Sequence, residues 1–195
     1  MKKIRLGLIR EGKLPPDHRV ALTPKNCRDL LKKFPFLEIY IQPSKYRCCS
    51  ANEYSNSGVH IREELNNCDI LMGIKEVPIT KLNSNKTYLF FSHTHKKQQH
   101  NRDLLKQLLV KKIEMIDYEC MLDKNGKKLV GFGRFAGIVG AHTTLWAWDK
   151  RNGKEQLKRA LDCRGYGDLQ GHYEDYKLGP VKIVVTGNGR SANGA

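Results

Sequence analysis

The chain has 195 residues, of which 39% are hydrophobic and 28% charged, and its formal net charge at pH 7 is +15. This composition is typical of a folded globular protein of one or two domains and argues against a disordered chain. No stretch approaches the ~20 apolar residues of a membrane span, and the apolar stretch at the N-terminus is too short for a signal peptide, so we expect a cytoplasmic protein.

The basic residues are spread along the chain, with lysine pairs recurring from 2–3 to 127–128, rather than gathered in one arm or helix. Because zinc-finger, RRM and KH signatures are also missing from the sequence, we expect neither a nucleic-acid nor a membrane partner. A basic cleft that attracts carboxylate or phosphate ligands is compatible with this charge. The cysteines form no C-x-x-C and the histidines no H-x-x-x-H, which predicts free thiols in a reducing compartment and no metal site.

Apolar runs alternate with helix signals along the first two thirds of the chain. Thr23 and Pro24 provide an N-cap and a first helical residue, a short helix is expected to end at Gly58, and DKNG predicts a turn. The expected strands are 4–9, 37–42, 69–74, 88–91 and 113–117, and the expected helical segments are 24–33, 50–57, 61–67 and 101–112.

Strands that are apolar along their whole length and alternate with helices predict an α/β domain with a Rossmann-like, doubly wound, mostly parallel sheet. Ligands bind such sheets beyond the carboxyl ends of the strands. Lys75 and Glu76 follow one expected strand, and Ser92 and His93 follow the next. These residues are therefore candidates for a site at one edge of the sheet.

The last third of the chain predicts a different organisation. Residues 132–150 predict a long helix that needs its glycines for close packing, and 151–180 read as a connecting segment with one helix near 154–162. Residues 181–185 predict a strand that runs into Gly187 and Gly189, the arrangement of a dinucleotide-binding turn, although a simple loop has the same residues. We therefore expect a substrate domain over 1–150, a connection over 151–180, and the first strand and glycine turn of a truncated NAD(P)-binding domain over 181–195, in the first part of a longer enzyme.

Seven blocks of sequence carry a resemblance to a known family: 9–24, 41–44, 73–78, 86–98, 115–119, 132–142 and 184–195. In this order they resemble the N-terminal half of the alanine dehydrogenase/NAD(P) transhydrogenase N-terminal family. Within it they are most similar to the lysine-forming saccharopine dehydrogenases and the lysine–ketoglutarate reductase domain, and KTYLFFSHTHKKQ (86–98) is the most specific block. The resemblance implies an oxidoreductase of two Rossmann-like domains that joins lysine and 2-oxoglutarate by NAD(P)H-dependent imine reduction, or runs the reverse reaction, with NAD or NADP as cofactor.

The same resemblance implies roles for individual residues. Lys75 and His93 match the two acid–base residues, and Arg19 matches the guanidinium that grips a substrate carboxylate. Further substrate-binding positions are Glu76, Lys96, Gln98 and Glu119, and the nucleotide-binding glycines are Gly187 and Gly189. Imine formation needs proton transfers at nitrogen and oxygen, which two groups that titrate near neutrality can perform.

Some positions depart from the family pattern and leave alternatives open. Lys127 and Lys128 stand where the family commonly has arginine, Thr143 stands where it usually has asparagine, and His95 where an apolar residue is more usual. The rival functions are an alanine dehydrogenase, acting on alanine and pyruvate, and a non-catalytic remnant that binds an anionic small molecule or a partner chain. The sequence allows a homo-oligomer, and each candidate residue taken alone is also compatible with an ordinary solvated or structural position.

Overall fold

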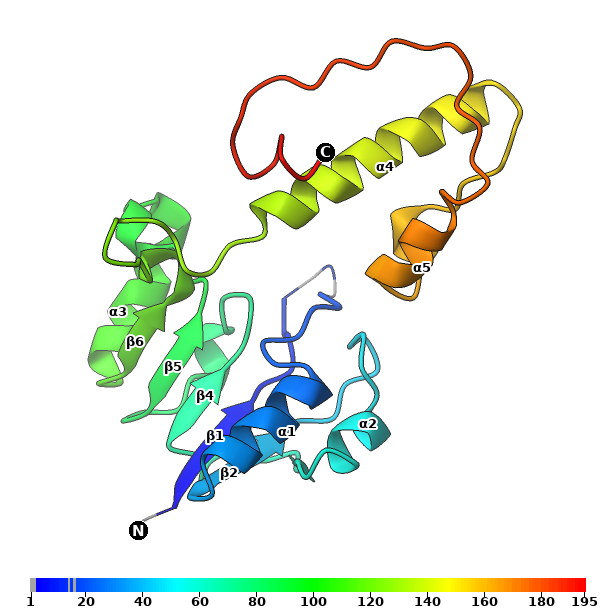
Figure 1. Cartoon of the computed structure of the whole chain (residues 1–195). Coiled ribbons are helices and arrows are strands. Elements are labelled where there is room, and N and C mark those ends of the chain that lie inside the picture. Colours follow the sequence, from blue (N-terminus) through cyan, green and yellow to red (C-terminus); the bar gives the residue numbers. More distant parts are fainter. Residues whose placement is uncertain (1–2, 14, 16) are drawn as a thin grey trace. The chain divides into compact units, whose positions relative to one another are not determined.

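The computed structural model describes residues 3–13, 15 and 17–195, so Leu14 and Pro16 of the matched block 9–24 lie outside the described residues (Figure 1). The chain forms two compact units, Met1–Val130 and Gly131–Ala195. The predicted domain limits at 150 and 180 stay predictions, and the division between compact units falls elsewhere. None of the described helices is long and apolar enough to cross a membrane.

The first unit is built on a six-stranded sheet in which every pairing is parallel. The strand order is β3-β2-β1-β4-β5-β6, so the order reverses between the neighbours β1 and β4. This confirms the predicted α/β, doubly wound, Rossmann-like fold. The strands are β1 Ile4–Leu8, β2 Leu37–Ile41, β3 His60–Ile61, β4 Ile70–Met72, β5 Thr87–Phe90 and β6 Glu114–Asp117.

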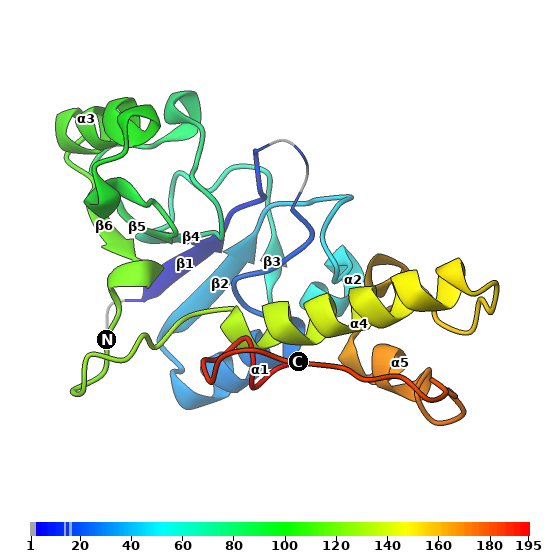
Figure 2. The same ribbon diagram turned by 90° about the horizontal axis from the view of Figure 1, so that it is seen from above.

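Helices cover the two faces of this sheet (Figure 2). Helices α1 (Pro24–Lys33) and α2 (Ala51–Ser55) lie on one face, and α3 (Arg102–Val110) lies on the other. Each face has its own core of buried side chains, as expected for strands that are apolar on both sides. The first core includes Leu6, Leu8, Ile39, Ile41 and Tyr54, and the second includes Leu71, Tyr88, Phe90, Leu104 and Leu108.

The predicted start of α1 is confirmed in detail. The Thr23 hydroxyl accepts a hydrogen bond from the Asn26 N–H, the Asn26 side chain accepts one from the Thr23 N–H, and Pro24 is the first helical residue. Helix α2 has the same type of capping box, and Gly58, with φ +85°, stands shortly after its end. Two-way capping satisfies N–H groups that have no partner inside the helix.

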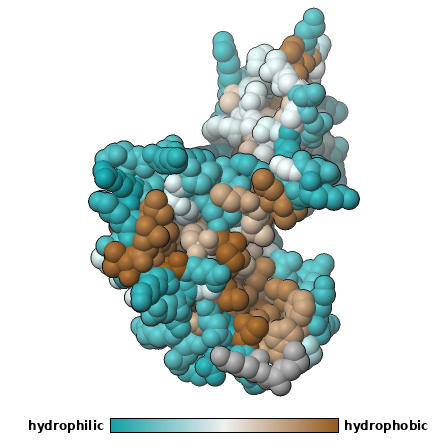
Figure 3. Space-filling model, turned by 90° about the vertical axis from the view of Figure 1, so that its left-hand side faces the viewer, coloured by the Kyte–Doolittle hydropathy of each residue, from teal (hydrophilic) through white to brown (hydrophobic). Residues whose placement is uncertain are grey.

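Helix α3 shows how tertiary contacts select one face of an apolar helix. Of its four leucines, Leu104 and Leu108 are buried, whereas Leu105 and Leu109 are exposed. Figure 3 shows brown hydrophobic patches that interrupt the hydrophilic surface on the side of α3 and β6. Leu109, Val110 and Ile116 are among the exposed apolar residues of these two elements.

Two predicted helical segments are wrong. Residues 61–67 do not form helical turns, because His60 and Ile61 pair with Tyr40 and Ile41 as the edge strand β3. The helix expected near 154–162 is replaced by a single 3-10 turn, Ala160–Asp162, and by α5 (Tyr166–Gly171). Here the buried Asp149 carboxylate accepts hydrogen bonds from the N–H groups of Gln156 and Leu157. Helix propensity does not take such a tertiary contact into account.

The long helix of the second unit is confirmed as α4 (Gly133–Arg151). Its glycines allow close contact with the end of the chain, because a Cβ added to Gly137 would lie 1.9 Å from the Ser191 carbonyl oxygen. The buried His142 ring bonds the Tyr173 hydroxyl and the Lys158 carbonyl, both at 2.7 Å. Helix α4 therefore anchors the connecting segment and the C-terminal turns of its own unit.

The strand predicted over 181–185 does not form. These residues join no sheet among the described parts of the chain, and Ile183 and Val184 are exposed. A strand that is apolar on both faces needs paired neighbours, and no other strand is found among the described residues of the second unit. The six cysteines are all free, as predicted.

Candidate active site

The ends of β4 and β5 lie side by side, and their pairing continues beyond the strands. The Gly73 N–H donates to the Leu89 carbonyl at 2.9 Å, and the Phe91 N–H donates to the Ile74 carbonyl at 3.0 Å. Lys75 therefore leaves the sheet directly after this pairing, and His93 leaves it two residues after Phe91. The structure thus places both predicted acid–base residues at the carboxyl ends of neighbouring strands.

A carboxylate that the sequence analysis did not select holds the backbone at Lys75. Glu11, which follows β1, accepts hydrogen bonds from the N–H groups of Ile74 at 2.7 Å and Lys75 at 2.8 Å. Burial raises the pKa of the Glu11 carboxyl, and the two N–H groups offset part of this rise. Glu11 therefore bridges β1 and β4 where the strand order reverses, the place at which doubly wound sheets bind ligands.

His93 has a constrained backbone. Its φ is +55°, a left-handed conformation that is uncommon for residues other than glycine, and its N–H donates to the buried Asp117 carboxylate at 3.0 Å. The same Asp117 oxygen accepts a hydrogen bond from the Ser92 hydroxyl at 2.7 Å. The His93 ring stacks on Phe91 with ring centroids 6.2 Å apart. Asp117, at the end of β6, thus fixes the turn that presents the imidazole.

The imidazole of His93 contacts the second carboxylate of this loop. Its Nδ1 lies 2.9 Å from Glu119 Oε2, and Lys96 Nζ lies 2.8 Å from the same oxygen. Lys128 Nζ contacts the other oxygen, Glu119 Oε1, at 2.8 Å. Hydrogen bonds from Lys128 first, then Lys96 and His93, hold the pKa of the Glu119 carboxyl well below its usual range. An ionised Glu119 favours the imidazole tautomer with hydrogen on Nδ1, which leaves Nε2 to accept a proton.

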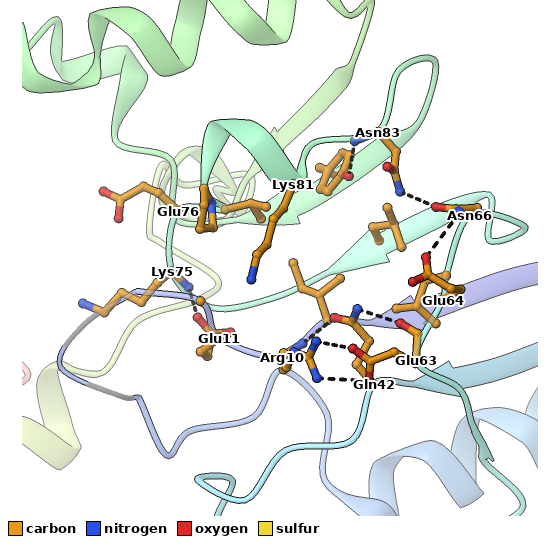
Figure 4. A pocket seen from close by; sticks show the side chains of 17 residues that line it. Arg10, Glu11, Gln42, Glu63, Glu64, Asn66, Lys75, Glu76, Lys81 and Asn83 are labelled. Carbon is orange, nitrogen blue, oxygen red and sulfur yellow. Dashed lines mark hydrogen bonds and ion pairs between the residues drawn. The ribbon is translucent and has the colours of Figure 1, made fainter.

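A cavity of about 290 Å³ opens beside Lys75 (Figure 4). Residues from the ends of β1 to β4 line it, and Arg10 and Glu63 form an ion pair at its floor. The Lys81 side chain reaches into this space, whereas the side chains of Lys75 and Glu76 extend away from Arg10 and Glu63. Glu76 is paired with Lys13. The cavity includes Lys75 and Glu76 in its lining, and His93 belongs to the separate cluster around Glu119.

Arg19 lies on the same side of the sheet but is engaged by a neighbour. Its guanidinium binds Asp17 in a bidentate manner, with Nε 2.9 Å from Oδ1 and Nη2 2.6 Å from Oδ2. This contact with Arg19 lowers the pKa of the Asp17 carboxyl, and the positive charge of Lys75 lowers it further. Arg19 and Glu11 both line a second, smaller hollow next to the first cavity. Gln98 is exposed and immediately precedes the 3-10 turn Gln99–Asn101.

The glycine turn of the second unit has neither a strand before it nor a helix after it among the described residues. Gly187 has the left-handed φ of +87° that a tight turn requires, but the preceding residues join no sheet, and turns rather than a helix follow it. A Cβ added to Gly189 would meet no atom within 4 Å. Gly187 and Gly189 therefore stay predicted cofactor-binding residues, and the described residues around them form no strand–turn–helix unit.

A parallel sheet of this order, with helices on both faces, defines a Rossmann-like domain. Residues 7–139 match the family described as "Alanine dehydrogenase/PNT, N-terminal domain". The chain belongs to this family.

Two curated relatives cover nearly the whole chain. The chain is 32% identical to the mouse mitochondrial alpha-aminoadipic semialdehyde synthase over 210 residues, which are 97% of this chain and 22% of that protein. It is 29% identical to the saccharopine dehydrogenase [NAD(+), L-lysine-forming] of Yarrowia lipolytica over 208 residues, which are 98% of this chain and 56% of that protein. The relatives are thus named for enzymes of the predicted class, and the chain spans well under two thirds of their length.

Two solved structures share the fold. A transhydrogenase from Sinorhizobium meliloti aligns with a TM-score of 0.59 and 11% identity over 72% of this chain and 43% of its own. An L-alanine dehydrogenase aligns with a TM-score of 0.55 and 15% identity over 83% of this chain and 43% of its own. At these identities the likeness shows the fold, and the site roles rest on the residues themselves.

Proposed function

We propose that the protein functions in an oxidoreductase that acts on an amino-acid C–N bond. The enzyme is of the lysine-forming saccharopine dehydrogenase type. The reaction joins lysine to 2-oxoglutarate through an imine that NAD(P)H reduces, or runs in reverse. The observation that carries the proposal is the placement of Lys75 and His93 at the ends of neighbouring strands, with His93 oriented by Glu119. The names of the relatives support the same class.

In this proposal the residues of the chain move protons and hold charge. When the lysine amine adds to the keto carbon, the carbonyl oxygen must gain protons and leave as water. The amine nitrogen must lose protons in the same process. In the proposed reaction His93 Nε2 and the Lys75 ammonium or amine, which follow neighbouring strands, are the two groups that exchange these protons. Lys96 and Lys128 keep Glu119 ionised, and Glu119 holds the His93 ring through Nδ1.

Positive groups near the edge suit an anionic substrate. Arg19 has the planar fork that binds both oxygens of a carboxylate, and in this role it would exchange part of its contact with Asp17 for the substrate. Glu76, at the rim of the cavity, and Gln98, after the His93 turn, are the candidate contacts for an amino group. The cofactor class, NAD or NADP, follows from the family, and we assign no step of the chemistry to the glycine turn.

One observation favours the alternative of an alanine dehydrogenase. Lys128, which stands at the position of a carboxylate-binding arginine in the family pattern, is bonded to Glu119. A lysine that is already paired is a weaker anchor for a second substrate carboxylate than a bidentate arginine. Alanine and pyruvate each carry one carboxylate and would not need this anchor.

The test compares substrates directly. Oxidation of NADH and NADPH is followed with lysine plus 2-oxoglutarate and with pyruvate plus ammonia. It is measured for the chain itself and for the chain extended along its reading frame past Ala195. Turnover with lysine and 2-oxoglutarate supports the proposal, and turnover with pyruvate and ammonia alone supports the alternative. If neither pair is turned over by either chain, both activities are contradicted, and NMR titration with saccharopine and with alanine then shows whether the chain binds an anionic small molecule without catalysis.

A further inference from the structure

Three side chains of the second unit that are typical metal ligands meet in the connecting segment. Cys163 follows the 3-10 turn Ala160–Asp162, and Asp168 and His172 stand four residues apart on α5 and at its end. That spacing places two side chains on the same face of a helix. The Cys163 Sγ, an Asp168 carboxylate oxygen and a ring nitrogen of His172 all lie within 4.8 Å of one another.

A second observation points to a ligand between them. His172 Nε2 is buried and has no hydrogen-bond partner among the described residues. The nearest Asp168 oxygen, Oδ1, is 3.9 Å away, which is too far for a hydrogen bond. An unsatisfied buried nitrogen destabilises the fold, whereas two ligands of one tetrahedral zinc ion stand about 3.3–3.8 Å apart. A nitrogen and an oxygen on one tetrahedral zinc ion stand at the short end of this range, about 3.3–3.4 Å apart, so His172 Nε2 and Asp168 Oδ1 would approach each other by about 0.5 Å on binding the ion.

The surroundings of Asp168 also suit a metal ligand. Its other oxygen, Oδ2, accepts a hydrogen bond from the Arg164 N–H at 2.8 Å. Such a bond fixes the orientation of a carboxylate and leaves the first oxygen directed at the ion. Leu169 is the buried residue of α5.

We propose that Cys163, Asp168 and His172 bind a Zn²⁺ ion, with water in the fourth position. A thiolate, an imidazole and a carboxylate form a mixed set of donors that suits zinc better than magnesium or calcium, which prefer oxygen ligands alone. The spacing, C-x4-D-x3-H, is none of the motifs on which the expectation of no metal site rested. The ion ties the 3-10 turn to α5, so it stabilises the connecting segment.

A second group of three ligand-type residues, His95, Asp117 and Cys120, is a weaker candidate. Asp117 Oδ2 already accepts hydrogen bonds from Ser92 and His93, and His95 and Cys120 are exposed. An ion there would have to displace contacts that hold the His93 turn. This group therefore provides the internal control for the experiment.

The experiment titrates the whole chain, freed of metal and kept reduced, with Co²⁺, and then displaces the cobalt with Zn²⁺. We expect one equivalent to bind with a thiolate-to-cobalt charge-transfer band and the visible spectrum of a tetrahedral site. Cys163→Ser removes the band, and Asp168→Asn and His172→Gln each weaken binding about tenfold or more. Cys120→Ser and His95→Gln leave band and affinity unchanged. Circular dichroism checks that each variant is folded.

Other results overturn the proposal. They are a wild-type chain that binds no cobalt, a charge-transfer band that persists in a Cys163→Ser chain, or a band that is lost with Cys120→Ser instead. If the Cys163→Ser chain fails to fold, the Asp168→Asn and His172→Gln variants decide, because both residues lie on the short helix α5 and its end. Unchanged cobalt affinity in both of them also contradicts the assignment.

Discussion

His93 Nδ1 lies 2.9 Å from Glu119 Oε2, and this contact joins the loop after β5 to the loop after β6. The two residues are 26 positions apart in the sequence and meet because the strands before them are paired in parallel. An imidazole held by an ionised carboxylate at one nitrogen presents its other nitrogen in a defined direction. This is the arrangement that an acid–base histidine needs.

Replacing His93 with glutamine is expected to lower turnover in the assay with lysine and 2-oxoglutarate by about 10²-fold or more. Glutamine keeps a polar side chain of similar reach but cannot exchange a proton near neutral pH. The matched control is His100→Gln, an exposed histidine on the following turn, which should retain wild-type turnover. Equal rates for the two variants would remove His93 from the site.

Replacing Lys75 with methionine is expected to reduce turnover by about 10²-fold as well. Methionine keeps the apolar stem, so the Ile74 and Lys75 N–H groups still bind Glu11, and only the ammonium group is lost. Lys106→Met, an exposed lysine on α3, is the control for loss of one positive charge. A Lys75→Met protein as active as this control would contradict the assignment of Lys75.

The loss of folding stability at acidic pH is expected to depend on Glu119. Its pKa lies below the ordinary value of 4.5 in the folded chain, chiefly because of Lys128. The folded state therefore binds this proton less readily than the unfolded state. The resulting stabilisation is fully present above about pH 4.5 and is lost as the pH falls through the folded pKa.

Two measurements check this linkage. Carbon-13 NMR of the carboxyl groups should show the pKa of Glu119 rising toward its ordinary value in a Lys128→Gln chain. Urea unfolding should show that Glu119→Gln reduces the difference in stability between neutral and acidic solution, whereas Glu174→Gln, at an exposed position, should leave it unchanged. An unshifted Glu119 in the wild-type chain would contradict the ion-pair geometry.

Replacing Gly7 with alanine is expected to destabilise the sheet by about 1–3 kcal/mol, because the added methyl group overpacks a filled core. A Cβ at Gly7 would lie 2.8 Å from Leu71 Cδ2 and 3.0 Å from Cys68 Sγ. Gly140→Ala on α4, where an added Cβ meets nothing within 4 Å, is the control and should be neutral or slightly stabilising. The free energy of unfolding in urea distinguishes them, and equal stabilities would show that the core at Gly7 is loosely packed.

The sequence by itself determined the local structure and the class of fold. The apolar runs predicted five of the six strands, Thr23 and Pro24 predicted the start of α1, and the alternation predicted a parallel sheet. These features depend on neighbouring residues and on the burial of whole strands, which a sequence displays directly. The motifs also predicted the family, since they place the same residue types at the same strand ends.

The tertiary structure decided what depends on contacts between distant residues. Glu11 holds Lys75 across more than 60 positions, and Asp117 holds the His93 turn across 24. Both carboxylates lie in matched blocks of the sequence, but the sequence does not show which backbone groups they bind. Strand β3 exists because β2 offers an edge, while 181–185, although more apolar, have no such edge within their unit. A strand requires a neighbouring strand, and a site requires side chains from distant parts of the sequence. Only the tertiary fold brings these together.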